Sequence, residues 1–142
     1  MLRTIAAAAA FSCVAVAAQA SELDGLWTTP TDGGVVEIFD CGGGVCARVV
    51  DAGPLRGQPG LTDIRNKDHA LRGRPLKGLL VLQGFRGGPK TWAGGKAYDP
   101  ATGDAAQTAT LTLVSGQVLH VKGCVGPFCR TQVWRRKADA AL

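Results

Sequence analysis

The stretch AQTATLTLVSGQVLHVKGC, residues 106–124, carries the clearest secondary-structure signal in this chain. Its first half alternates threonine with Ala109, Leu111 and Leu113, and its second half again alternates apolar and polar residues. Strict alternation is typical of β-strands whose two faces meet different surroundings. The pair Ser115-Gly116 between the two halves favours a tight turn, so the stretch is predicted to form a β-hairpin.

Similar β-type runs recur on both sides of this hairpin, between glycine- and proline-rich breaks. The predicted strands are Gly25–Thr29, Val35–Asp40, Val45–Val50, Leu79–Arg86, Trp92–Asp99, Ala106–Val114, Gln117–Cys124 and Arg130–Arg136. A sandwich and a closed barrel are the two all-β solutions. Most connections are short, which favours up-and-down pairing, and closure removes the exposed edges of a small sheet. We therefore predict an all-β, eight-stranded up-and-down barrel.

One connection, residues 51–78 between the third and fourth strands, lacks strand character. Connections longer than about 12–15 residues are usually functional or disordered. Spaced apolar residues indicate that this long loop folds onto the barrel: Leu61, Ile64, Leu71 and Leu76. A short helix is expected near Lys67–Leu71.

The first twenty residues have the three-part layout of a secretory signal peptide. Arg3 supplies a positive charge, Ile5–Ala18 is apolar, and Ala18-Gln19-Ala20 places small residues where signal peptidase reads them. A membrane anchor is the competing interpretation, but a spanning helix needs about 20 apolar residues. Lipoprotein processing at Cys13 is a minor alternative. We expect cleavage after Ala20 and a periplasmic or secreted protein.

The mature chain, residues 21–142, has the length of a single domain. The whole chain has a net charge of +5, and removal of Arg3 with the leader lowers it to +4. This mild excess favours contact with an anionic envelope surface. The most basic stretch, residues 65–77, has no aromatic side chain on which bases could stack, which argues against nucleic-acid binding. No second apolar run is long enough to span a membrane.

The mature chain has an even number of cysteines, in two pairs of equal spacing: Cys41 with Cys46, and Cys124 with Cys129. In an oxidising compartment these cysteines are expected to form disulfides, although a four-thiolate zinc site is the alternative. The turns that carry the two pairs fall at opposite ends of the predicted barrel. We therefore predict one disulfide within each pair.

Longer motifs follow one another along the chain: Gly25-Leu-Trp27, Val36-Glu-Ile-Phe-Asp-Cys-Gly42, Asn66 with Asp68, Leu71-Arg-Gly-Arg-Pro-Leu76, Trp92-Ala-Gly-Gly-Lys-Ala-Tyr-Asp-Pro100 and Arg130-Thr-Gln-Val-Trp-Arg135. In these motifs nearly the whole mature chain resembles the bacterial family known as domain of unknown function 2147. The resemblance implies an exported, lipocalin-like barrel and no established activity. The chain departs from the family pattern at Lys67, where proline is usual, and at Ala47, where glycine is usual.

The motif Gly25-Leu-Trp27 also resembles the Gly-x-Trp signature that opens lipocalin barrels. In those proteins the tryptophan closes the base of the barrel, and an arginine from the last strand packs over its ring. The resemblance implies that Trp27 is buried at the base, with Arg130, Arg135 or Arg136 as its cation–π partner.

Catalytic chemistry is poorly represented in the mature chain. It has only two serines, neither in a Gly-x-Ser-x-Gly turn, and only two histidines, too few for a histidine-rich metal centre. An enzyme that uses Asp63, Asp68 or Asp99 as a general acid or base is the least favoured function. We expect no metal and no cofactor.

Connectivity locates a candidate binding site. In an up-and-down barrel alternate connections share one end, so residues 30–34, the long loop, residues 100–103 and residues 125–129 are expected to cluster. Barrel mouths hold ligands. The candidate binding residues there are Asn66, Asp68, Arg72, Arg74, Tyr98 and Asp99. The two arginines either form a clasp with Asp99 or Asp68, or bind an anionic ligand group through paired hydrogen bonds.

Two classes of function follow. The favoured one is a non-enzymatic periplasmic barrel that binds a small amphipathic or anionic envelope molecule. The alternative is a structural or interaction protein of the envelope whose barrel is filled by side chains. An unfilled interior of several hundred Å³ would distinguish the binder from the alternative.

Overall fold

The computed structural model describes residues 8–14 and 21–138. Residues 1–7 and 15–20 of the predicted signal peptide lie outside this part of the chain, so cleavage after Ala20 stays a prediction. No helix among the described residues is long and apolar enough to cross a membrane. Within the described residues, every strand and every buried core residue lies between Leu23 and Arg136.

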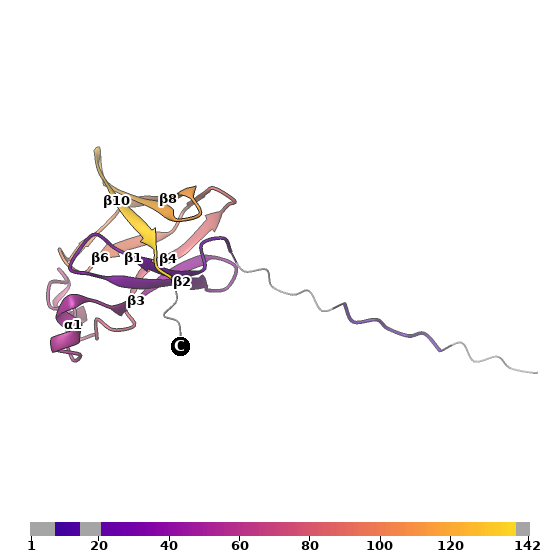
Figure 1. Ribbon diagram of the computed structural model, residues 1–142, viewed down its shortest axis with the longest axis horizontal. Coiled ribbons are helices and arrows are strands. Elements are labelled where there is room, and N and C mark those ends of the chain that lie inside the picture. Colours follow the sequence, from indigo (N-terminus) through magenta and orange to yellow (C-terminus); the bar gives the residue numbers. More distant parts are fainter. Residues whose placement is uncertain (1–7, 15–20, 139–142) are drawn as a thin grey trace, which may run out of the picture.

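The strands form a closed antiparallel barrel (Figure 1). They are β1 (Gly25–Thr28), β2 (Val35–Asp40), β3 (Val45–Asp51), β4 (Leu80–Gly87), β5 (Thr91–Ala93), β6 (Lys96–Asp99), β7 (Asp104–Ala105), β8 (Thr108–Ser115), β9 (Val118–Val125) and β10 (Phe128–Arg136). Pairing of β10 with β1, and of β3 with β4, completes the ring. The predicted eight-stranded, all-β architecture is confirmed, because β5 and β6 together occupy one strand position beside β4 and the two-residue β7 pairs with β6 alone.

The predicted strand Trp92–Asp99 is wrong in one respect, since it is broken into β5 and β6 at Gly94 and Gly95. Gly94 has a positive φ of 78°. A side chain at Gly95 would place its Cβ 2.3 Å from the Phe85 ring. Because of the break, the two halves pair with different strands. β5 pairs with β8, whereas β6 pairs with β7.

The hairpin predicted from residues 106–124 is confirmed, with Leu111 opposite Val121 and Leu113 opposite Leu119. Leu111 and Leu119 are fully buried, as the alternation predicts. The following hairpin is longer than predicted, because β10 begins at Phe128 rather than at Arg130.

Both predicted disulfides are present. Cys41 is bonded to Cys46 across the β2–β3 turn, with 5.8 Å between the two Cα atoms. Cys124 faces Cys129 across the β9–β10 turn and is bonded to it, with a Cα–Cα distance of 4.0 Å. Two disulfides are consistent with a non-cytoplasmic location.

The base of the barrel is closed by Trp27, whose side chain is fully buried. Its indole Nε1 donates a hydrogen bond of 2.8 Å to the Leu23 carbonyl oxygen. The Arg136 guanidinium lies 4.3 Å from the centre of the Trp27 ring, so Arg136 is the cation–π partner among the three candidates. Arg136 also donates to the Gly116 carbonyl in the β8–β9 turn, which ties the last strand to the same end.

The connection between β3 and β4 contains two short helices, α1 (Gly53–Gly57) and a 3-10 turn at His69–Leu71. The 3-10 turn lies where a short helix was expected. The helix α1 was not predicted; Pro54 in its first turn fits the preference of proline for helix starts. Of the spaced apolar residues, Leu61 and Leu76 pack against the core. The expectation is wrong for Ile64 and Leu71, which are 69% and 40% exposed.

Candidate functional site

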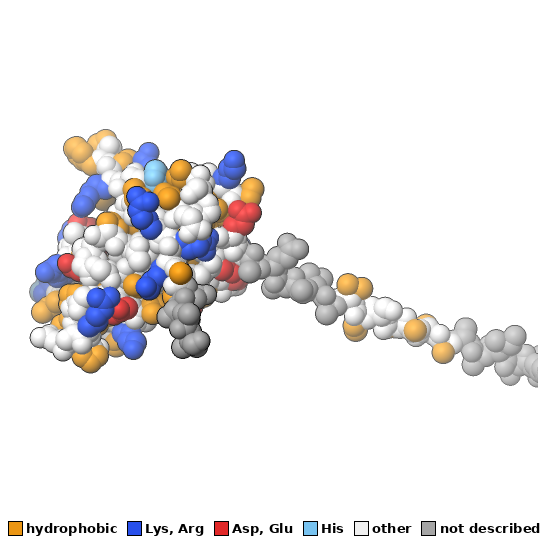
Figure 2. All heavy atoms as spheres, viewed as in Figure 1, with side chains coloured by type: hydrophobic (Ala, Val, Ile, Leu, Met, Phe, Trp, Pro, Cys, Tyr) orange, Lys and Arg blue, Asp and Glu red, His pale blue; other side chains and the backbone are white. Residues whose placement is uncertain are grey.

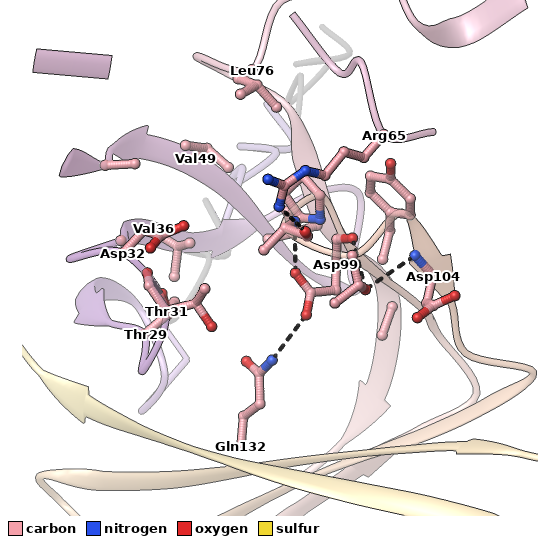
Figure 3. Close-up of a pocket in the computed structure, with 18 of the residues that line it drawn as sticks. Thr29, Thr31, Asp32, Val36, Val49, Arg65, Leu76, Asp99, Asp104 and Gln132 are labelled. Atoms are coloured by element: carbon pink, nitrogen blue, oxygen red, sulfur yellow. Dashed lines mark hydrogen bonds between the residues drawn. The ribbon is translucent and has the colours of Figure 1, made fainter. Parts of the chain in front are cut away.

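A cavity of about 540 Å³ opens at the end of the barrel that carries the β3–β4 connection, and Trp27 is not among the residues that line it. Figure 3 shows part of its lining. Apolar side chains of four strands form its inner wall: Val36, Val49, Val81, Leu82 and Val121. Its rim includes residues from all four connections that were predicted to lie at one end of the barrel: residues 30–34, 51–78, 100–103 and 125–129. The interior of the barrel is therefore hollow at this end, which counts against a barrel filled by side chains.

A line of polar groups crosses the cavity wall from β10 to β6. Trp134 Nε1 donates to Gln132 Oε1 at 2.9 Å, and Gln132 Nε2 donates to Asp99 Oδ2 at 3.3 Å. The other Asp99 oxygen accepts a hydrogen bond of 2.9 Å from the Ala101 backbone amide. Figure 3 shows Gln132 reaching from β10 toward Asp99. Asp99, Gln132 and Trp134 all line the cavity, so this chain of hydrogen bonds forms part of its wall.

Gln132 and Trp134 are functional candidates that our reasoning from the sequence missed. Alternate residues of a strand share one face, so Arg130, Gln132 and Trp134 all point toward the cavity. The alternation within β10 is the sequence signal that could have found them.

The rim of the cavity is both apolar and charged. Ile64, Val125 and Phe128 line the opening and are 69%, 50% and 80% exposed. Arg65 and Arg130 lie at the same opening. In Figure 2 hydrophobic side chains gather at the upper-left tip, where Figure 1 places the β9–β10 hairpin, with basic side chains close by. Such a mouth suits a molecule that has both apolar and polar parts.

The connection between β3 and β4, residues 52–79, is held against the barrel by hydrogen bonds to Asp63, whose carboxylate is buried. Its Oδ1 accepts a 2.6 Å hydrogen bond from the Tyr98 hydroxyl, and its Oδ2 accepts bonds of 2.9 Å from Asn66 Nδ2 and Arg74 Nε. The Arg74 guanidinium also lies over the Tyr98 ring, 5.2 Å from its centre. We call Asp63, Asn66, Arg74 and Tyr98 the Asp63 cluster.

Two opposing effects set the pKa of Asp63. Burial raises the pKa of this carboxyl, but the hydrogen bonds from Tyr98, Asn66 and Arg74, with the charge of Arg74, outweigh burial and leave the pKa below its ordinary value. Burial and the bond to Asp63 raise the pKa of Tyr98 to about 12. The cluster therefore holds an ionised Asp63 and a neutral Tyr98 at pH 7.

A second set of contacts joins the long connection to the β6–β7 turn. Arg65 Nη1 donates to the Ala101 carbonyl, and Lys67 forms an ion pair with Asp104. Gly103 has a φ of 78°, and a Cβ there would lie 1.9 Å from the Arg65 carbonyl oxygen. Only glycine allows the two segments to approach so closely.

The six predicted binding residues divide into separate groups. Asn66, Arg74 and Tyr98 meet at Asp63, whereas Asp99 lies in the cavity wall with Gln132. Arg72 Nε donates to the Asn66 carbonyl at 2.7 Å, and Asp68 is exposed and accepts from the Ala70 amide. The pairing of the arginines with Asp99 or Asp68 differs from the structure, which pairs Arg74 with Asp63. The sequence suggested Asp68 and Asp99 as partners of the arginines and missed Asp63 as the partner of Arg74, because this pairing depends on how the connection folds back onto the barrel.

A further hollow of about 580 Å³ lies beside the Asp63 cluster. Its polar lining includes Asn66, Arg74 and Tyr98. Each of these side chains already donates a hydrogen bond to Asp63, so the cluster works as a clasp that holds the connection. Among the described residues, no three His, Cys, Asp or Glu side chains are grouped to bind a metal ion.

The closed antiparallel barrel, with Trp27 under Arg136 at its base and a cavity at its mouth, is a lipocalin-like barrel. The fold is similar to that of protein HP1028 from the human pathogen Helicobacter pylori, which is described as belonging to the lipocalin family. That similarity has a TM-score of 0.71 at 25% sequence identity and covers 84% of this chain and 85% of that protein.

The chain belongs to the family described as "Uncharacterized protein conserved in bacteria (DUF2147)", whose model matches residues 25–136. No curated protein matches the chain significantly. The family match confirms the resemblance noted in the sequence.

Proposed function

We propose that this protein is an exported, non-enzymatic barrel that binds a small amphipathic or anionic molecule of the cell envelope. The observation that carries the proposal is the cavity of about 540 Å³, which lies within the size range of roughly 300–1,000 Å³ of small-molecule sites. The apolar chain of the ligand lies against Val36, Val81 and Val121. Its polar group lies at the mouth, within reach of Gln132, Asp99, Arg65 and Arg130.

Export is supported by two independent features. The first twenty residues have the layout of a signal peptide, and both disulfides belong to an oxidising compartment. A periplasmic location would bring the barrel close to the amphipathic molecules of the envelope.

The cavity can be tested with the anionic amphipathic dye 1-anilinonaphthalene-8-sulfonate. Val121 is buried in the cavity wall, so Val121→Phe should fill part of the cavity and weaken dye binding at least tenfold, or about 1.4 kcal/mol. Energy transfer from Trp134, which lines the cavity, reports occupancy, and Trp134→Phe should reduce this transfer.

Val114→Phe is the matched control, because Val114 is 57% exposed and is not part of the cavity lining. Equal melting temperatures of the two phenylalanine variants would exclude partial unfolding as the cause. Native mass spectrometry of the protein purified from its own periplasm would then identify the bound molecule. Dye binding unchanged by Val121→Phe, together with no co-purified molecule, would overturn the proposal.

A further inference from the structure

A buried carboxylate oxygen near the start of the barrel lacks a partner. Asp24 Oδ1 is the single buried side-chain polar atom without a hydrogen bond within residues 8–14 and 21–138. The other oxygen, Oδ2, accepts a bond of 3.2 Å from the backbone nitrogen of Ser21. Buried polar atoms are nearly always paired, so an unpaired carboxylate oxygen calls for an explanation.

The segment that presents Ser21 to Asp24 is firmly held. Leu23 is fully buried, and its carbonyl accepts from Trp27 Nε1. Arg136 donates to the carbonyls of Asp24 and Glu22, at 3.0 and 2.6 Å. The Asp24 amide in turn donates to the Ser21 carbonyl at 3.0 Å. The nitrogen of Ser21 is therefore fixed beside the carboxylate by the same contacts that close the barrel base.

We propose that Ser21 is the first residue of the mature protein and that its new α-ammonium group binds the Asp24 carboxylate. Hydrolysis breaks the bond between the Ala20 carbonyl carbon and the Ser21 nitrogen. Water supplies a hydroxyl to that carbon and a proton to the nitrogen, so the products at neutral pH are a carboxylate and an ammonium. A backbone amide donates one hydrogen bond, whereas an ammonium donates three and can bond both oxygens of Asp24. Cleavage thus supplies the missing partner.

The charges around Asp24 agree with this assignment. Burial raises the pKa of Asp24, the Ser21 amide lowers it, and the charge of Asp40 raises it further. The Arg136 guanidinium is directed at backbone carbonyls. A positive charge at Ser21 would therefore stabilise an ionised Asp24 that the uncleaved chain leaves with an unpaired oxygen. This inference is independent of the proposed ligand binding, because it concerns only the closed end of the barrel.

The pairing can be measured with residues 21–142, which contain every strand and core residue of the described part of the chain. One chain would begin with the free Ser21 amine, and a second would carry Gly-Ala before Ser21. The added residues should raise the unfolding equilibrium constant about tenfold, because they remove a charge-assisted hydrogen bond. In chains carrying Asp24→Asn, the same addition should have little effect. An equal effect in both backgrounds would overturn the proposed pairing.

The pH dependence provides a second readout that needs no substitution. Pairing raises the pKa of the Ser21 amine above the ordinary value of about 7.7–8.0. Its contribution to stability is therefore complete below that range and is lost as the pH rises through the raised pKa. The charged groups nearby, Glu22, Asp40 and Arg136, are common to both chains and cancel in the comparison. A stability difference that does not change between pH 7 and pH 10 would contradict the ammonium's role.

The cleavage position itself is tested by the intact mass of the full chain after export in a bacterial host. The expected mass is that of residues 21–142 with two disulfides. A chain that begins at any other residue, including a lipid-modified Cys13, would overturn the assignment of Ser21.

Discussion

Replacing Trp27 with alanine should lower the free energy of unfolding by about 3–5 kcal/mol, the usual cost of removing a buried tryptophan. The ring is fully buried under the Arg136 guanidinium, and its Nε1 bonds the Leu23 carbonyl. The truncation would leave a cavity at the barrel base and an unpaired carbonyl. Urea denaturation of the wild type and the variant measures the difference.

Trp27→Phe is the control for this experiment. Phenylalanine keeps an aromatic ring beneath Arg136 but cannot donate the hydrogen bond to Leu23, so it should cost less than alanine. An alanine variant as stable as the wild type would mean that Trp27 does not close the barrel.

Replacing Asp63 with alanine should cost about 3 kcal/mol, because it leaves several donors without their common acceptor inside the fold. The Tyr98 hydroxyl, Asn66 Nδ2 and Arg74 Nε would all lose their bond to the carboxylate. The connection between β3 and β4 should then loosen and become sensitive to protease, while the barrel strands remain protected. A connection that stays resistant to protease would show that other contacts hold it.

The same residue should make stability depend on acid. The pKa of Asp63 in the folded protein lies below its ordinary value of about 3.9. Its stabilising contribution is therefore present above pH 3.9 and is lost as the pH falls through the lowered pKa. Asp63→Asn keeps the shape of the side chain without the charge, so this variant should lack that part of the acid dependence. Identical pH profiles of the two proteins would exclude Asp63 as the source.

The substitutions of Trp27 and Asp63 test the two ends of the barrel independently. Trp27 acts at the closed base, whereas Asp63 acts on the connection beside the mouth. Because the two sites share no contact in the structure, their effects on unfolding should be additive.

Alternation and turn residues were enough to predict most of the strands, and the disulfides followed from cysteine spacing together with the predicted placement of the two turns at opposite ends of the barrel. Alternation along residues 106–124 depends only on the period of a strand, and the two cysteine pairs each lie a few residues apart across one turn. The break at Gly94 and Gly95 was missed. Gly95 lies against the Phe85 ring of another strand, where a Cβ would not fit, and no local pattern reveals that contact.

The sequence by itself determined an all-β barrel with one disulfide across each of two turns, because alternation, turn residues and cysteine spacing act between near neighbours in the chain. The position of Trp27 at the base followed from the resemblance of its motif to the lipocalin signature. Only the tertiary structure decided that Arg74 pairs with Asp63, and that Gln132 meets Asp99 in a hollow interior. Asp99 and Gln132 lie 33 positions apart in the chain. Their meeting depends on barrel closure and register, which place distant side chains together and which no short stretch of sequence specifies.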